Sequence, residues 1–334
     1  MNRLNLLKSA LALVLGVAFL AGCQGGKTET GDTATGTTGT PSEKADYVVG
    51  FSQIGAESAW RTANTQSIQD EAKKRGIELK FSDAQQKQEN QIRAIRSFIA
   101  QGVDYIAFSP VVETGWEPVL KEAKEAGIPV IVSDRRPDVP DDLYVTFIGS
   151  DFVKEGRMAG EWLVEKMGGK AVIAELEGTP GSAPANDRKK GFAEAISAHP
   201  DMKVVFAQTG EFTRAKGKEV MEALLKSPVG NQITALYAHN DDMALGAIQA
   251  IEEAGKKPGV DIIIVSIDGV KGAFEAMIAG KLNCSVECNP LLGPPLFDAI
   301  AALHEGKTLE KRIVIEDKMY DQSQAEAELP NRKY

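Results

Sequence analysis

The chain alternates short apolar runs with longer segments whose apolar residues recur at helical spacing. The apolar runs predict β-strands at residues 47–52, 78–82, 105–109, 130–133, 144–148, 171–176, 203–207, 235–237, 262–267 and 285–287. The segments between them predict amphipathic helices, for example at residues 90–100, 116–126, 154–167 and 241–254. The glycines expected to end helices are Gly76, Gly102, Gly127, Gly168 and Gly255. This alternation predicts α/β architecture, with parallel sheets covered by helices on both faces.

The length of the alternating region indicates two lobes. Residues 46–290 contain two series of strands, which is more than a single five-stranded α/β sandwich needs. The second series begins after Gly149-Ser150-Asp151, so the break between the lobes is expected there. Two doubly wound parallel-sheet lobes joined at this point would leave a cleft faced by the carboxyl ends of both sheets.

The first residues have the pattern of an export signal. Basic residues precede an apolar run at 10–21 that is too short to span a bilayer, and small residues precede Cys23. Leu20-Ala21-Gly22-Cys23 resembles the bacterial lipobox, in which the cysteine is acylated; the alternative is an ordinary signal with a coincidental cysteine. The expected organisation is a lipoprotein signal peptide at 1–22, lipidation at Cys23 and a flexible tether at 23–45, rich in Gly, Thr and Ser.

The charge of the chain argues against nucleic acid as a partner. Lys and Arg number 38 against 47 Asp and Glu, a net charge of −9. Removal of residues 1–22 takes away Arg3 and Lys8 and leaves 36 basic residues, so the net charge becomes −11. A surface this acidic, without a basic stripe, favours solubility and repels phosphate backbones.

The cysteines and histidines predict neither a disulfide nor a metal site. Cys284 and Cys288 are four residues apart, which in a strand means about 13 Å at about 3.3 Å per residue, too far to bridge. Both are expected to be packed thiols. The three histidines, His199, His239 and His304, are scattered without ligand spacing, so no metal and no cofactor is expected.

Asp134 and Arg135 directly follow the apolar run at 128–133, where a buried strand is expected to end. A carboxylate accepts hydrogen bonds and a guanidinium donates them, so the pair could bind adjacent hydroxyls of a small polyol. Ligands of open parallel sheets bind outside the carboxyl ends of the strands, which is where this pair falls. The alternative is a structural ion pair at the end of a strand.

Other predicted strands are also followed by residues suited to a sugar. Candidates after the first strand are Glu57, Ser58, Trp60 and Arg61, and candidates in the second series are Arg188, Phe212, Asn240, Asp268 and Glu287. Each has a structural alternative: Trp60 could be a core residue, Asn240 a helix N-cap and Asp268 a turn residue. Their convergence on one cleft favours a binding site for a small polyol.

Several stretches resemble the periplasmic sugar-binding proteins of ABC importers, of the ribose- and galactose-binding type. They are ESAWR (57–61), DAQQKQENQ (83–91), TGWEP (114–118), DRKKGF (187–192), YAHNDDM (237–243) and SIDG (266–269). The resemblance extends from Tyr47 onward and is nearest to the galactofuranose-binding type. It implies that Asp134 and Arg135 bind sugar hydroxyls from the first lobe. Its other implied contacts are Arg188, Asn240, Asp268 and Glu287 from the second lobe and hinge, with Trp60 and Phe212 as stacking faces.

The resemblance also implies a type I periplasmic binding protein that closes around its ligand. The chain should cross between the lobes near 149–151, 287–289 and 314–318. The N-terminal lobe would contain residues 46–149 and 288–316, and the C-terminal lobe residues 150–287 and 317–334. Both lobes would bind the sugar only after hinge closure.

The expected function is that of a lipid-anchored, monomeric solute-binding protein that delivers a monosaccharide to an ABC permease and its ATPase. Ribose binders carry two neighbouring phenylalanines where this chain has Trp60-Arg61. The guanidinium adds donors within reach of a side arm on the ring, so galactofuranose or a related furanose or hexose is favoured.

Three alternatives have less support. A sugar sensor that presents the closed form to a receptor would have the same fold, so the sequence does not decide between transport and sensing. A glycoside-processing enzyme could use Asp134, Asp268 and Glu287, but neighbouring arginines would keep such carboxylates ionised. The sequence also lacks a Gly-x-Ser-x-Gly elbow and a phosphate-binding glycine loop. A transcription regulator is disfavoured because the export signal occupies the place of a DNA-binding domain.

Overall fold

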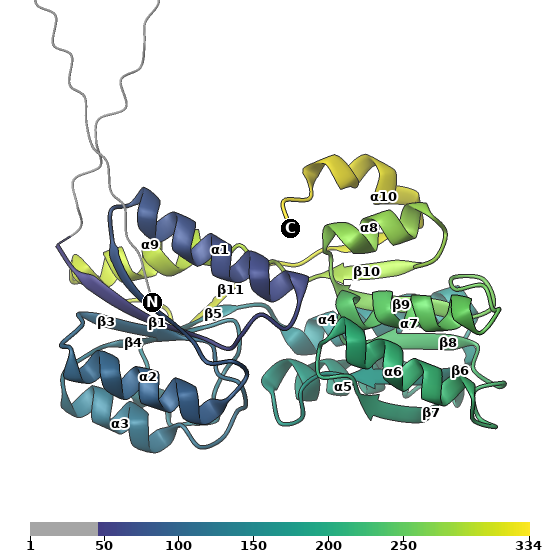
Figure 1. Ribbon diagram of the computed structural model, residues 1–334, viewed down its shortest axis with the longest axis horizontal. Coiled ribbons are helices and arrows are strands. Elements are labelled where there is room, and N and C mark those ends of the chain that lie inside the picture. The colour runs from purple at the N-terminus through teal and green to yellow at the C-terminus, as the bar shows by residue number, and fades with distance from the viewer. Residues whose placement is uncertain (1–45) are drawn as a thin grey trace, which may run out of the picture. The chain divides into compact units, whose positions relative to one another are not determined.

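The structure, a computed structural model, describes residues 46–334. The expected signal peptide, the lipidation at Cys23 and the tether lie outside these residues. The described chain forms two six-stranded sheets, each with helices packed against it (Figure 1). We call each sheet with its helices a lobe. The predicted class, two doubly wound parallel-sheet lobes, is confirmed.

The first lobe has the strand order β11-β5-β4-β3-β1-β2, with all pairs parallel. Its strands are β1 (Val48–Gln53), β2 (Glu78–Asp83), β3 (Tyr105–Phe108), β4 (Val130–Ser133), β5 (Thr146–Gly149) and β11 (Arg312–Val314). Its helices are α1 (Ala59–Lys74), α2 (Gln88–Ala100), α3 (Glu117–Glu125) and α9 (Gly293–His304), with a 3₁₀ turn at Asp141–Leu143.

The second lobe repeats this order as β12-β10-β9-β8-β6-β7, in which only β12 runs antiparallel to its neighbour. Its strands are β6 (Lys170–Glu177), β7 (Asp201–Thr209), β8 (Ala235–Ala238), β9 (Ile263–Asp268), β10 (Cys284–Glu287) and β12 (Met319–Asp321). Its helices are α4 (Phe152–Met167), α5 (Ala183–Ile196), α6 (Arg214–Leu225), α7 (Asp241–Glu253), α8 (Lys271–Ile278) and α10 (Gln322–Glu328), with a 3₁₀ turn at Leu329–Asn331.

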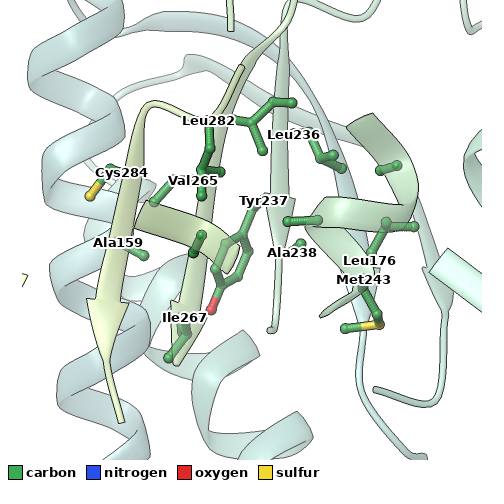
Figure 2. Packing of buried hydrophobic residues seen from close by; sticks show 14 of the residues in the cluster. Ala159, Leu176, Leu236, Tyr237, Ala238, Met243, Val265, Ile267, Leu282 and Cys284 are labelled. Carbon is green, nitrogen blue, oxygen red and sulfur yellow. The ribbon is translucent and has the colours of Figure 1, made fainter. Parts of the chain in front are cut away.

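Both faces of the central strands of each sheet are buried, as the continuous apolar strands predict, whereas the edge strands β2, β7 and β11 are partly exposed. In the first lobe, one face of the sheet packs against α2 and α3, and the other packs against α1 and α9. In the second lobe, Figure 2 shows Tyr237 of β8 beside Val265 and Ile267 of β9. The ring of Tyr237 stacks on Phe192 of α5 at 4.0 Å, and its hydroxyl donates to the backbone oxygen of Arg188 at 3.3 Å.

The helix ends agree with the sequence. All five glycines that were expected to end helices have left-handed backbones, with φ between 62° and 76°. Among the described residues, Cys284 and Cys288 are free and buried, which confirms that both are packed thiols. No helix within residues 46–334 combines the length and apolar character needed to cross a membrane.

Glycines allow α4 and α5 to pack backbone against backbone. A Cβ atom on Gly156 of α4 would lie 2.1 Å from the backbone oxygen of Arg188. A Cβ atom on Gly191 of α5 would lie 2.0 Å from the backbone oxygen of Val153. Because backbone atoms cannot rotate away as side chains can, this pair of glycines fixes the position of Arg188 on α5.

We therefore expect Gly191→Ala to lower the free energy of unfolding by about 1–3 kcal/mol, the usual cost of overpacking. Gly272→Ala in α8 is the matched control. There the added Cβ would meet only the end of the Leu245 side chain, at 3.1 Å, so stability should stay unchanged or rise slightly. Urea denaturation of both variants measures the difference. Equal stability of the two variants would contradict the packing argument.

Candidate binding site between the two lobes

A pocket with about 290 Å³ of space between atoms lies between the lobes. Its lining comes from both lobes: Glu57, Ser58, Trp60, Arg61, Asp134, Arg135, Phe152, Pro184, Arg188, Phe212, Asn240, Asp268 and Cys288. All the predicted site residues except Glu287 are in this lining. Phe152, Pro184 and Cys288 were not predicted.

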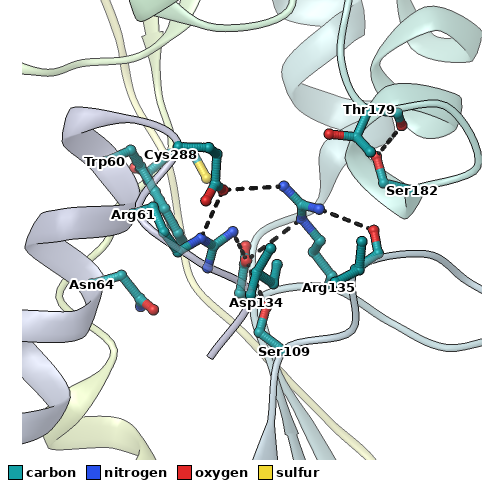
Figure 3. A network of polar contacts seen from close by, with 12 residues as sticks. Trp60, Arg61, Asn64, Ser109, Asp134, Arg135, Thr179, Ser182 and Cys288 are labelled. Carbon is teal, nitrogen blue, oxygen red and sulfur yellow. Dashed lines mark hydrogen bonds and ion pairs between the residues drawn. The ribbon is translucent and has the colours of Figure 1, made fainter. Parts of the chain in front are cut away.

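In the first lobe, buried arginines form ion pairs with Asp134 and Glu57. Figure 3 shows Asp134 between Arg61 and Arg135. The Arg61 Nη2 atom donates to Asp134 Oδ2 at 2.7 Å, and its Nε atom donates to Glu57 Oε1 at 3.0 Å. Ser109 Oγ, just after β3, donates to the same Asp134 oxygen at 2.9 Å. Arg135 lies further away, with Nε 3.9 Å from Asp134 Oδ2 and Nη2 3.6 Å from Glu57 Oε1. The closest cation to Asp134 is therefore Arg61 and not its neighbour in sequence.

The two guanidiniums differ in their electrostatics. Burial alone would lower the pKa of Arg61, but Asp134 and Glu57 outweigh it and raise this pKa above its usual value. For Arg135, burial and the nearby charges of Arg61 and Arg188 lower the pKa to about 10. The positive charge of Arg61 is thus balanced by two carboxylates of the protein, whereas the positive charge of Arg135 is balanced less well.

Trp60 is both a core residue and a wall of the pocket. It is 5% exposed, and its indole Nε1 donates to the backbone oxygen of Cys288, close to the end of β10. The Arg61 guanidinium carbon lies 4.6 Å from the centre of the indole ring. Asn64, one turn further along α1, donates to the backbone oxygen of Pro290 at 3.0 Å. These bonds connect the start of α1 with the segment that follows β10.

In the second lobe, Arg188 is held by groups from three elements. Its Nε donates to Glu155 Oε2 of α4 at 2.7 Å, and its Nη1 donates to the backbone oxygen of His239 at 2.7 Å. Its Nη2 lies 3.6 Å from Asp268 Oδ1 at the end of β9. Burial would lower the pKa of Arg188, but Glu155 and Asp268 contribute to raising it instead. Burial raises the pKa of Asp268 well above its ordinary value.

Asn240 connects a helix N-terminus to the aromatic wall. Its side-chain oxygen caps α7 by accepting from the backbone N–H of Met243 at 3.0 Å. Its side-chain nitrogen donates to the backbone oxygen of Phe212 at 3.1 Å. The ring of Phe212 faces Arg135 at 5.2 Å and Arg188 at 5.9 Å, so guanidiniums of both lobes approach one aromatic ring.

Three lining residues have strained backbones. Asp134, Phe212 and Asp268 have φ values of 64°, 61° and 133°, in a region that residues with a Cβ rarely adopt. Such strain concentrates where the surrounding structure fixes a residue for binding. Gln85, Gln86 and Glu211 outside the lining share this strain, so it supports a binding site here only together with the geometry of the pocket.

Glu287 lies outside the lining because the end of the chain binds its carboxylate. Its Oε1 accepts from Arg332 Nη1 at 2.8 Å and from Tyr334 Oη at 2.9 Å. These partners are more than 40 residues away in the sequence, so the run that ends in Glu287 could not reveal them. We leave Glu287 out of the proposed ligand contacts.

Two polar atoms of lining residues are buried without a hydrogen-bond partner in residues 46–334: Glu57 Oε2 and Arg135 Nε. One is an acceptor and the other a donor. Leaving a buried polar group unpaired costs about 1–3 kcal/mol, so such groups indicate where a ligand supplies the partner. In the described part of the chain, His, Cys, Asp and Glu side chains form no cluster that could hold a metal ion.

Comparison with known proteins identifies the family. The family model described as periplasmic binding protein domain matches residues 49–308. The chain belongs to the periplasmic binding protein family. The galactofuranose-binding protein YtfQ of Escherichia coli (strain K12) is 53% identical over 293 residues, which cover 86% of this chain and 92% of that protein. This relative and the family model are both described as binding proteins.

Two solved structures agree with this assignment. The periplasmic binding protein of the arabinose ABC transporter of Shewanella sp. ANA-3, bound to α- and β-L-arabinofuranose, is 56% identical and has a TM-score of 0.83; the match covers 86% of this chain and 95% of that one. A protein of Mycobacterium smegmatis in complex with β-D-fucofuranose is 55% identical, with a TM-score of 0.84 and the same coverage. The predicted type I periplasmic binding protein fold is confirmed.

Proposed function

We propose that this chain binds a monosaccharide in its furanose form, galactofuranose or a close relative, in the pocket between the lobes. The observation that carries the proposal is the buried network around Arg61, in which Glu57 Oε2 and Arg135 Nε stay without protein partners in the described residues. A sugar hydroxyl both donates and accepts, so neighbouring hydroxyls suit an unpaired acceptor beside an unpaired donor. The furanose ligands named for the two solved relatives and the name of the Escherichia coli relative support the ring form.

The remaining lining residues fit this role. Asp134, Asp268 and Arg188 would bind ring hydroxyls, Ser58 and Asn240 would add neutral hydrogen bonds, and Trp60 and Phe212 would cover the faces of the sugar. An aromatic face packs well against sugar C–H groups because both surfaces are flat and apolar. Specificity would follow from burial, since a sugar without one hydroxyl leaves a carboxylate unpaired at a cost of about 1–3 kcal/mol.

Arg61 has a more specific role in this proposal than adding donors for a side arm. Three of its N–H groups already donate to Glu57, Gln53 and Asp134. Its main contribution is therefore to hold both carboxylates in fixed orientations. A guanidinium has five N–H groups, so two remain for a hydroxyl beyond the ring.

We further infer that the protein is exported, attached to the membrane through Cys23, monomeric, and delivers its sugar to an ABC permease and its ATPase. The family and the transporter named for the Shewanella relative support the transport role. The crossings near 149–151, 287–289 and 314–318 would act as the hinge.

Calorimetric titration of the purified protein with D-galactose, L-arabinose, D-fucose, D-ribose and D-glucose tests the ligand class. We expect binding of the first three through their furanose forms, with ribose and glucose weaker by about 10-fold or more, the effect of about 1.4 kcal/mol. Among D-galactose, L-arabinose and D-fucose, an apparent Kd that varies inversely with the furanose fraction of the sugar would support the ring form. If no sugar binds at millimolar concentration, the proposed function is wrong.

A further inference from the structure

Asp242 of α7 lies outside the pocket lining but connects the two lobes directly. Its Oδ2 accepts from the backbone N–H of Ala59, the first residue of α1, at 2.7 Å. The two residues are 183 positions apart in the chain and belong to different lobes. The Asp242 side chain is 8% exposed, so water competes little for this bond.

The partner of Asp242 is a group that needs an acceptor. The first N–H groups of a helix have no partner within the helix, and an anion at that end is favoured by the helix dipole. The side chain of the N-cap Ser58 accepts from the backbone N–H of Arg61, at 3.0 Å, and so leaves the N–H of Ala59 without a partner in its own lobe. The carboxylate of Asp242 in the second lobe thus supplies the hydrogen-bond acceptor that the N-terminus of α1 lacks in its own lobe.

The other oxygen of Asp242 pairs within its own lobe. Oδ1 accepts from Arg214 at 3.1 Å through Nε and lies 2.9 Å from Arg214 Nη2. One carboxylate oxygen therefore faces the second lobe and the other faces the first. The Arg214 side chain is 55% exposed, so this pair should contribute little to the position of Asp242.

A second direct contact between the lobes is more exposed. The backbone N–H of Glu113 donates to the backbone oxygen of Gly181 at 2.9 Å, and Asn186 Nδ2 donates to Glu113 Oε2 at 2.6 Å. Asn186 is exposed to solvent, so its bond should contribute little. The two contacts therefore differ in burial while serving the same pair of lobes.

We propose that Asp242 is a positioning residue that stabilises the closed arrangement of the lobes and thereby slows release of the sugar. The inference rests on the proposed function, because it concerns the affinity of the same pocket. The first turn of α1, which Asp242 binds, carries the lining residues Trp60 and Arg61. A contact made only when the lobes close raises the ratio of closed to open protein, and the affinity for the sugar rises by the same factor as this ratio.

Stopped-flow measurement of sugar binding, with L-arabinose and D-galactose as probes and intrinsic tryptophan fluorescence as the signal, tests the role of Asp242. We expect Asp242→Ala to raise Kd by about 10- to 100-fold, the effect of losing a hydrogen bond to a charged group. The increase should appear in the dissociation rate, with the association rate within about threefold of wild type, because the contact forms after encounter. Asp242→Asn keeps an acceptor without the charge and should give an intermediate dissociation rate.

Two variants provide matched controls. Arg214→Ala removes the partner of Asp242 within its own lobe but keeps the bond to Ala59, and Asn186→Ala removes the exposed side-chain bond between the lobes. Both should change Kd by less than about fivefold, the upper range for exposed interactions. A dissociation rate in Asp242→Ala equal to that of wild type, or an equal change in Arg214→Ala, would overturn the proposal.

Amide exchange separates this inference from the proposed function. If the wild-type protein binds neither sugar, the proposed function fails, but exchange at Ala59 still reports the contact. Faster exchange in Asp242→Ala than in wild type and Arg214→Ala supports the interlobe bond. Exchange at the same rate in all three proteins overturns it. Asp242→Asn provides the same readout if the alanine variant does not fold.

Discussion

Arg61→Met should abolish sugar binding and destabilise the protein. The change leaves Glu57 and Asp134 buried without their main cation, and breaking a buried ion pair by removing one partner costs about 3–5 kcal/mol. Arg61, Glu57 and Asp134 are 2%, 2% and 6% exposed in their side chains, so water cannot replace the guanidinium. We expect Kd to rise by at least about 100-fold, equivalent to about 2.8 kcal/mol.

The control for this prediction is Arg96→Met on α2. Arg96 pairs with Glu122 at 2.7 Å, but the two side chains are 53% and 40% exposed. Exposed pairs contribute about 0–1 kcal/mol, so this variant should bind and unfold like the wild type. Calorimetric titration and urea denaturation measure both variants. Binding by Arg61→Met within threefold of wild type would show that the network around Arg61 does not organise the pocket.

The second large effect concerns Asp241, whose carboxyl group is buried at the start of α7. It accepts from Ser266 Oγ, from Ser285 Oγ at 2.8 Å and from the backbone N–H of Val270 at 2.9 Å. Burial outweighs these bonds and raises the pKa of Asp241 to about 7. In the unfolded chain the pKa returns to about 3.9. Between these values the folded protein holds a proton that the unfolded chain has released.

The free energy of unfolding should therefore fall as pH rises from about 4 to about 7, by up to about 4 kcal/mol from this group. Asp317, whose pKa burial and Glu155 raise to about 8, acts in the same direction. Asp241→Asn isolates the first contribution, because the difference between wild type and variant cancels all other groups. Wild type should lose stability relative to Asp241→Asn between pH 4.5 and pH 7.5 in urea denaturation.

Asp201→Asn on the exposed start of β7 is the control for this experiment and should show no such trend. A constant difference between wild type and Asp241→Asn across this pH range would mean that the carboxyl group is ionised in the fold at all these values. The hydrogen bonds from Ser266, Ser285 and Val270 would then dominate over burial.

The sequence was sufficient to predict the edge of the sheets where the pocket lies. Parallel strands of one sheet bring their carboxyl ends together, so residues that follow neighbouring strands, such as Asn240 after β8 and Asp268 at the end of β9, lie at the same edge. The partners within the site were less predictable. Asp134 and Arg135 are adjacent in sequence, yet the left-handed backbone of Asp134 turns its carboxylate toward Arg61, 73 residues earlier. Adjacent residues need not pair where the backbone is strained.

Other parts of the structure could not be predicted from the pattern of apolar and polar residues. β11 and β12 are three-residue edge strands, too short for an apolar run and paired on one side only. Phe152 is the first residue of α4, directly after the break between the lobes. An apolar residue in that position is predicted to lie in the core and not in a binding site. Cys288 was correctly predicted to be a packed thiol, but its place in the lining depends on the crossing after β10. These features are set by contacts between distant segments.

The route of the chain also governs when the first lobe can fold. Its core contains Leu296, Phe297 and Ile300 of α9, packed with Val49 and Phe51 of β1. The ribosome must therefore make most of the second lobe before one face of the first sheet is covered. Until then α1 alone covers that face, and the part that packs against α9 stays exposed. For a protein of a periplasmic family, such late completion keeps the polypeptide in the unfolded state that translocation across a membrane requires.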